Sequence, residues 1–270
     1  MRRTILGVLC AALVLMGAVA PATAGDGAPV LSRIVERGTI NVGMTGSQPP
    51  FNMKAKDGSI IGYDVDLAEL LADAMGVELN IVIMKFDELL PALKAGKIDA
   101  VMSGVTMTPR RNLEAAFVGP YLVSGKAILT TDKALAAIAE AEDLDTAKLK
   151  VAALKGSTSQ DFVEQAMPKV QLVTVEDYDT GIAKVMDGTV DAMVADYPIL
   201  ALTVLRNPGK GLKVSETPLS IEPMGIALPA GDFLFVNMVQ NYFTALDGIG
   251  VLDALEKEWF EDGSWLSQLP

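Results

Sequence analysis

The alternation of strand-length and helix-length segments constrains the fold of this 270-residue chain more than any other feature. In the first half, apolar runs that suit buried strands alternate with amphipathic segments that suit helices. Asp64 precedes the first of these helices as a cap, and Gly76 ends it. The pattern predicts a strand, a helix, a strand, a helix and a strand at residues 39–43, 65–75, 77–84, 87–94 and 98–102. This order is typical of a mostly parallel sheet covered by helices.

The same order begins again at residue 150. It predicts alternating strands and helices at residues 150–154, 157–167, 170–175, 178–187 and 190–195. The two halves also end alike, because residues 94–102 and 185–193 each contain a helix end, a Gly and an apolar strand with an Asp-Ala pair. We interpret the chain as two lobes of one α/β architecture. Coincidence is the alternative, since helix–Gly–strand junctions are common in α/β proteins.

Two further extended segments predict a hinge between the lobes. Residues 125–131 lie between the two halves, and residues 224–229 follow the second half. The rest of the chain has helical character, and if it returns to the first lobe, two strands cross between the lobes beside a cleft. The predicted division is a first lobe of residues 25–128 and 222–270 and a second lobe of residues 129–221.

The first 24 residues have the pattern of a secretory signal peptide. Two Arg residues form the basic start, residues 5–20 are apolar, and residues 22–24 supply the small residues expected before a cleavage site. An uncleaved membrane anchor is the alternative, but the apolar run is short and lacks flanking stop-transfer charges. Cys10 lies inside this run, so we interpret it as part of the signal rather than as a lipidation site. We expect a mature periplasmic protein that starts at Gly25.

The composition of the mature chain excludes several classes of chemistry. The sequence contains no His, and cleavage would remove its one Cys, which excludes Ser-His-Asp and Cys-His nucleophiles and His or Cys metal sites. Of 22 basic and 34 acidic residues, two basic ones fall in the signal, which leaves a mature net charge of −14. This charge argues against nucleic acid or anionic lipid as the main partner. We expect a monomer without a cofactor or metal.

The segment at residues 103–111 follows the carboxyl end of the third predicted strand, where open α/β sheets bind their ligands. Thr108 suits a helix cap and Pro109 a first helical residue, which places Arg110 and Arg111 in the first turn. Positive charge there opposes the helix dipole at a cost of roughly 0.3–1 kcal/mol. Free N–H groups, hydroxyls and a guanidinium together suit a carboxylate ligand. The alternative is an ordinary cap with two solvated Arg residues.

The second half offers a similar helix start. Ser157 and Thr158 open a predicted helix after a strand, and Ser157 with Gln160 suits a capping box. Asp196 follows the last strand and suits a ligand ammonium group or, equally, a helix start. Phe86 suits a pocket wall or, more simply, the core. Weaker candidates at loops and strand ends are Gln48, Phe51 and Glu222.

Segments along nearly the whole mature chain resemble the polar amino-acid-binding proteins of ABC importers, the periplasmic type with two crossing strands. These segments are residues 37–43, 50–51, 62–68, 91–99, 106–111, 117–121, 156–158, 190–192 with Asp196, 225–229 and 257–260. The resemblance implies a two-lobed type II periplasmic-binding fold. It also implies a non-enzymatic protein that closes around a small carboxylate-bearing ligand and presents it to a membrane permease.

The resemblance further implies roles for individual residues. Arg111, rather than Arg110, would bind the α-carboxylate of the ligand, with Thr106 beside it. Thr158 would contribute from the second lobe through its backbone, next to Ser157, and Asp196 would accept the α-ammonium group.

Other positions depart from the pattern of the family. Phe86 matches a wall over the ligand, but Gly104 stands where relatives often carry a Ser, so any contact there would involve the backbone. Gln48 stands where an aromatic residue often stacks on the ligand, and Thr45 where binders of basic amino acids often carry Asp. These departures weaken the expectation of a basic ligand and leave its side chain open.

Two alternatives to transport stay open at this point. Some exported proteins of this fold resemble cyclohexadienyl dehydratases, and Glu222 is a candidate for the general acid that such an enzyme requires. The second alternative is a free-standing ligand-sensing protein that acts as the partner of a membrane receptor.

Overall fold

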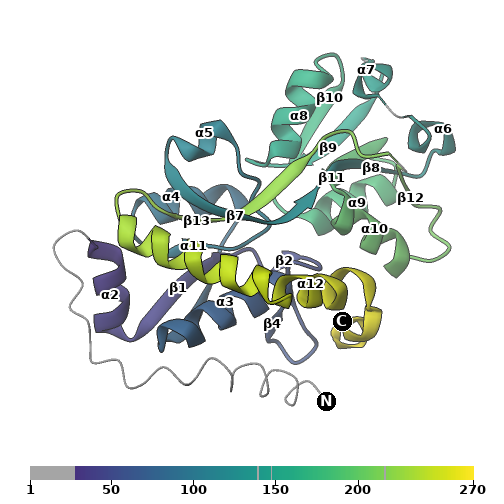
Figure 1. Cartoon of the computed structure of the whole chain (residues 1–270). Coiled ribbons are helices and arrows are strands. Elements are labelled where there is room, and N and C mark those ends of the chain that lie inside the picture. Colours follow the sequence, from purple (N-terminus) through teal and green to yellow (C-terminus); the bar gives the residue numbers. More distant parts are fainter. Residues whose placement is uncertain (1–27, 139, 147, 216) are drawn as a thin grey trace.

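The computed structural model describes residues 28–270 apart from 139, 147 and 216, and it has the predicted two-lobed α/β architecture (Figure 1). The predicted signal peptide, with Cys10, and the predicted start at Gly25 lie outside the described residues. Each lobe contains one five-stranded sheet. Within the described ranges, no helix has both the length and the apolar character that crossing a membrane requires.

The sheet of the first lobe has the strand order β5-β1-β6-β13-β7. β1 pairs in parallel with β5 and β6, as the alternation of strands and helices predicts, whereas β13 pairs antiparallel with β6 and β7. The strands are β1 (Thr39–Met44), β5 (Glu78–Ile83), β6 (Ala100–Val101), β7 (Ala115–Ser124) and β13 (Glu222–Pro229).

The sheet of the second lobe follows the same plan, with the order β10-β9-β11-β8-β12. β9 pairs in parallel with β10 and β11, and β8 pairs antiparallel with β11 and β12. The strands are β8 (Lys126–Thr130), β9 (Lys150–Leu154), β10 (Gln171–Val175), β11 (Ala192–Asp196) and β12 (Lys213–Val214). The predicted likeness of the two halves is therefore present in the fold.

The chain crosses between the lobes twice: β7 leads from the first lobe to the second, and β13 leads back into the first (Figure 1). β7 is followed at once by β8 of the other sheet, with Gly125 between them, and the return passes Ser220 into β13. The crossing segments touch: a Cβ on Gly125 would lie 2.4 Å from the carbonyl oxygen of Ser220, so only Gly fits. Sheet membership thus changes at Gly125, whereas the lobe boundary expected at residue 128 falls inside β8.

Helices cover both sheets. In the first lobe they are α2 (Pro29–Arg37), α3 (Tyr63–Met75), α4 (Phe86–Lys94), α5 (Pro109–Asn112), α11 (Phe233–Gly248) and α12 (Val251–Glu256), followed by a π-helical turn (Lys257–Glu261) and a 3₁₀ helix (Gly263–Gln268). In the second lobe they are α6 (Lys133–Ala136), α7 (Ala141–Leu144), α8 (Thr158–Ala166), α9 (Tyr178–Met186) and α10 (Tyr197–Arg206). A small sheet of β2 (Ser47–Gln48), β3 (Asn52–Lys54) and β4 (Ile60–Ile61) completes the first lobe.

The expectation that Asp64 caps α3 is wrong. The helix begins at Tyr63, one residue before Asp64, so Asp64 lies inside its first turn. The Asp64 side chain is fully buried. It accepts hydrogen bonds from the Tyr121 hydroxyl, the Asn52 amide and the Gly104 backbone N–H. Burial raises the pKa of Asp64 to about 6, although these three hydrogen bonds act to lower it. Asp64 thus supports the loop that follows β6 instead of the helix end.

Asp232 is the cap that joins the two ends of the first lobe. It is buried, and its carboxylate accepts from the backbone N–H of Phe235 at 2.9 Å, in the first turn of α11. The same carboxylate accepts from the N–H groups of Val30 and Leu31 at 2.8 and 2.9 Å, in the first turn of α2. One side chain therefore satisfies two helix N-termini that lie about 200 residues apart in the chain.

Candidate functional site

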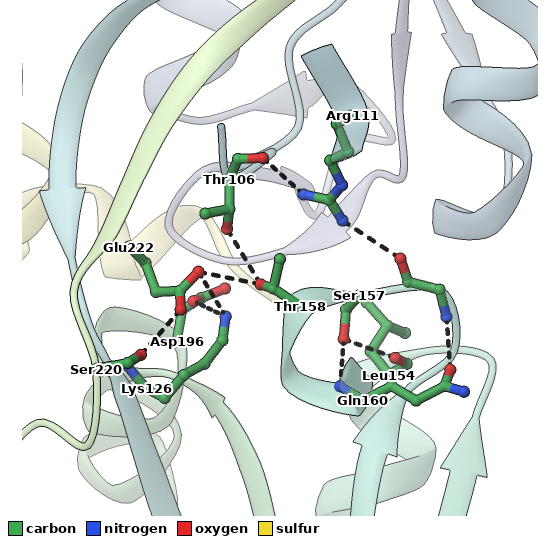
Figure 2. Close-up of polar contacts among 11 residues, drawn as sticks. Thr106, Arg111, Lys126, Leu154, Ser157, Thr158, Gln160, Asp196, Ser220 and Glu222 are labelled. Atoms are coloured by element: carbon green, nitrogen blue, oxygen red, sulfur yellow. Dashed lines mark hydrogen bonds and ion pairs between the residues drawn. The ribbon is translucent and has the colours of Figure 1, made fainter. Parts of the chain in front are cut away.

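Arg111 lies in the first turn of α5, where the first lobe faces the second (Figure 2). Its backbone N–H donates to the Thr108 hydroxyl, which caps the helix as the Thr-Pro pair predicts. The guanidinium donates to the carbonyl of Thr106 at 2.8 Å and to the carbonyl of Gly156, in the other lobe, at 3.3 Å. It also lies 5.7 Å from the ring centroid of Phe86. The Arg side chain thus reaches across the cleft.

The two neighbouring Arg residues have different surroundings. The Arg110 side chain is 84% exposed and pairs with Asp161 at 3.7 Å on the outer rim. Arg111 is half-buried; burial lowers its pKa, and nearby carboxylates, including those of Asp196 and Glu222, act in the opposite direction. An anion inside the cleft would therefore face Arg111 rather than Arg110.

The start of α8 supplies the opposite wall of the cleft. The Ser157 hydroxyl caps the helix by accepting from the N–H of Gln160, and the Gln160 side chain accepts from the N–H of Gly156, which forms the expected capping box. The Thr158 hydroxyl lies 3.2 Å from the Thr106 hydroxyl of the first lobe. The lobes are therefore closed on each other in this structure.

A buried ionic cluster lies beside these two Thr residues. The Lys126 ammonium, in a side chain only 1% exposed, is 2.7 Å from Asp196 Oδ1 and 3.3 Å from Glu222 Oε2. Glu222 also accepts from the hydroxyls of Thr158 at 3.1 Å and Ser220 at 2.9 Å. Lys126 and Asp196 belong to the second lobe and Glu222 opens β13 of the first, so the cluster spans the hinge (Figure 2).

The side chain of Asp196 pairs with Lys126 and does not cap a helix. Asp196 is the residue that precedes α10, but its carboxylate makes no capping hydrogen bond and pairs with Lys126 instead. Sequence reasoning missed Lys126; the available signal was a single Lys at the start of an apolar strand, opposite Asp196 in the antiparallel register. Burial alone would raise the pKa of Glu222, but the charge of Lys126 and hydrogen bonds from nearby hydroxyls lower it below its ordinary value.

Gly104 and Gln48 lie under the cleft and are engaged by protein groups. Gly104 has a φ of +56°, which favours glycine, and a Cβ there would lie in ordinary contact with the Phe51 ring at 3.5 Å. The buried Gln48 carbonyl accepts from the hydroxyls of Thr45 and Ser103. These contacts place both residues in the support of the site.

A cavity of about 300 Å³ opens between the lobes beside Phe86. Its lining from the first lobe includes Thr45, Gln48 and Phe86, and its lining from the second lobe includes Glu176 and Tyr178. This volume is at the lower end of the range for small-molecule sites.

Ion pairs also join the rims of the two lobes. Lys85 pairs with Glu176 at 2.8 Å, and Lys155 pairs with Asp87 at 2.9 Å. Because three of these four side chains are about half exposed, solvent screens both pairs and each contributes little to stability. Groups inside the cleft must therefore supply most of the specificity of closure.

Two α/β lobes that are joined by two crossing segments and closed on a polar cleft define a two-lobed ligand-binding protein. The sequence profile of the bacterial extracellular solute-binding proteins, family 3, matches residues 40–262. The chain belongs to this family.

Individual relatives support the assignment. The chain is 30% identical over 259 residues to the L-cystine-binding protein TcyJ of Escherichia coli K12, covering 96% of this chain and 95% of that protein. It is 26% identical to cyclohexadienyl dehydratase of Pseudomonas aeruginosa, covering 86% of each chain. Among solved structures, the ancestral amino acid-binding protein AncCDT-1, a precursor of cyclohexadienyl dehydratase, matches with a TM-score of 0.80 and 35% identity, covering 86% of this chain and 99% of that one. A lysine complex of a binding component from Wolinella succinogenes matches with a TM-score of 0.80 and 33% identity, covering 86% and 99%.

Proposed function

We propose that this protein binds an amino acid or a close analogue between its lobes and delivers it to the membrane permease of an ABC importer. The observation that carries the proposal is the meeting of Arg111, from one lobe, with the Thr158 helix start and the Lys126–Asp196–Glu222 cluster at the hinge. A guanidinium and a carboxylate pair across one cleft match the two charged ends of an amino acid. The amino-acid-binding relatives support the same conclusion.

In this proposal the residues divide into three groups. Arg111 and Thr106 bind the α-carboxylate together with the α8 start at Ser157 and Thr158. Asp196 and Glu222 accept the ammonium group. Phe86 walls the ligand side chain, and Gln48 and Gly104 support the floor beneath it.

The ligand would act by stabilising the closed arrangement. An open form exposes the cleft, and a ligand that contacts both lobes favours closure by the difference between its affinities for the two forms. The lobes that move are residues 25–124 with 222–270 and residues 126–219, with the hinge at Gly125 and Ser220, so the first boundary lies at Gly125 rather than at the expected residue 128. We propose that the mature protein works in the periplasm as a monomer after signal cleavage.

Dehydratase activity is the second candidate, because one relative carries that name. A general acid must hold a proton near neutral pH, whereas the pKa of Glu222 lies below its ordinary value. This observation favours binding without turnover. Incubation with prephenate and arogenate tests the point, and the appearance of an aromatic product would establish the enzyme instead.

A thermal-shift screen over amino acids, opines, dicarboxylates and small peptides tests the binding proposal. At a ligand concentration about 100 times the Kd, stabilisation is about 2.7 kcal/mol. For a chain of this length that corresponds to a shift in Tm of roughly 5–10 °C. The absence of a shift with every amino-acid-like compound would overturn the proposed substrate class.

A further inference from the structure

The charged groups proposed to bind the two ends of the ligand are balanced together with Lys126. Arg111 and Lys126 are positive, and Asp196 and Glu222, which both pair with Lys126, are negative. Lys126, Asp196 and Glu222 are 1%, 5% and 7% exposed, so solvent screens their charges weakly. Burial lowers the pKa of Arg111, and the charges of Asp161, Asp196 and Glu222 act to raise it, so Arg111 lies within electrostatic reach of both carboxylates of the cluster.

The acidic residues that line the 300 Å³ cavity also have partners within the protein. Glu176 lies 2.8 Å from the ammonium of Lys85 and 3.7 Å from that of Lys155, which in turn pairs with Asp87. Asp177 uses its carboxylate to cap α9. The acids that line this cavity are therefore engaged, and a cationic ligand side chain would find no unengaged carboxylate among them.

The balance depends on Lys126 in particular. Without its ammonium group, Asp196 and Glu222 would form an uncompensated pair of buried carboxylates beside the proposed ammonium site. Such a pair would attract a second positive charge. With Lys126 present, the cluster keeps a net charge of about −1, which matches the single ammonium of a bound zwitterion, while Arg111 matches its carboxylate.

We infer that Lys126 sets the charge class of the ligand: the cleft takes a zwitterion with an uncharged side chain and discriminates against cationic and anionic side chains. The inference rests on the proposed function and narrows it. A cationic side chain would add an unmatched positive charge to a closed cleft, and an anionic one an unmatched negative charge. Burial of either is unfavourable without a partner.

Titration calorimetry with side chains of matched shape tests the inference on the mature protein. The pairs are citrulline with arginine, norleucine with lysine, and glutamine with glutamate. In each pair that binds, we expect the uncharged member to bind at least about tenfold more tightly, because one unmatched charge acts at short range in a poorly solvated site. Equal or tighter binding of the charged members would overturn the inference but leave the proposed function standing. If no α-amino acid binds, the proposed function fails first and the inference with it.

The variant Lys126→Met tests the role of the residue itself. It should raise the affinity for arginine relative to citrulline by at least about tenfold, because the cleft loses a positive charge. Lys169→Met is the matched control, since it removes the same charge from an exposed side chain that pairs with Asp145 and belongs neither to the cluster nor to the cavity lining, and it should change that ratio less than threefold. An unchanged ratio in folded Lys126→Met protein would overturn the assignment. If this variant does not fold, Glu222→Gln decides: loss of a negative charge should move the ratio in the opposite direction, and no movement would count against the inference.

Discussion

Gly156 and Asp87 touch across the closed cleft, and a Cβ on Gly156 would lie 2.8 Å from the Cβ of Asp87. Gly156 precedes α8 in the second lobe, and Asp87 lies in the first turn of α4 in the first lobe. Gly156 also has a φ of +73°, which favours glycine for a separate, local reason. The two effects can be separated, because only the contact with Asp87 requires the lobes to close.

We expect Gly156→Ala to weaken ligand binding by at least about tenfold, because overpacking by a methyl group costs about 1–3 kcal/mol in the closed form. Gly188→Ala is the matched control, since Gly188 has a φ of +76° and a Cβ there would have no neighbour within 4 Å. Both variants should lose about 1 kcal/mol of unfolding free energy from backbone strain. Calorimetry with the best ligand from the screen and urea unfolding measure the two quantities, and equal affinities of the two variants would contradict the expected clash.

The carboxylate-binding role separates Arg111 from its neighbour. Arg111→Ala should abolish the ligand-induced shift in Tm, because a half-buried guanidinium that bridges both lobes is lost. Arg110→Ala should largely retain the shift, because that side chain is 84% exposed on the rim. The measurement is the thermal shift at a fixed, saturating ligand concentration. Wild-type binding by Arg111→Ala would refute the site.

Much of the fold could be predicted because each half repeats apolar strands and helices that end at glycine. β1, β9 and β11 lie within a residue or two of their expected positions. The third strand is shorter than the expected residues 98–102, because β6 pairs with β1 at only two positions and with β13 at one. The wrong role for Asp64 arose because a helix-start pattern does not reveal three distant donors that draw the side chain inward.

The candidate site was predictable only in part, for a reason of topology. Local capping patterns in the sequence indicate Arg111 and Ser157, and the structure places both residues beside the cleft. Lys126 contacts Asp196 from 70 residues away, through antiparallel pairing of β8 with β11. No local sequence pattern predicts that partner. A Lys in an apolar strand does not by itself reveal which acidic residues will lie next to it in the folded protein.

Asp232→Ala should destabilise the protein by about 2–4 kcal/mol, because one substitution removes the caps of two helices and leaves buried N–H groups unpaired. Asp177→Ala is the matched control: it removes a single cap, a 2.7 Å bond to the N–H of Thr180, and should cost about 1 kcal/mol. Urea unfolding of both variants checks the difference. Equal losses would mean that Asp232 does not hold α2 and α11 together.

The pH dependence of stability reports on Glu222. Its folded pKa lies below the ordinary value of 4.5, so its ionised form stabilises the fold above about pH 4.5, and that contribution is lost as the pH falls through the folded pKa. Glu222→Gln should therefore be less stable than wild type by about 1–3 kcal/mol at pH 7, and the gap should narrow toward pH 3. Asp64, with a pKa raised to about 6, loses stability as the pH rises, but it is common to both proteins and cancels in the difference. A gap that is constant with pH would contradict the lowered pKa.

The position of β13 between β6 and β7 has a consequence for the order in which the molecule assembles. A chain that is synthesised from its N-terminus completes every strand of the second sheet by residue 214, whereas the first sheet lacks the strand between β6 and β7 until residue 229 has been added. Until then, the ten residues of β7 have no neighbouring strand on the side where β13 will pair. The lobe that begins first in the sequence is thus the lobe that is completed last, and the growing chain has an incomplete first sheet until its last fifth is synthesised.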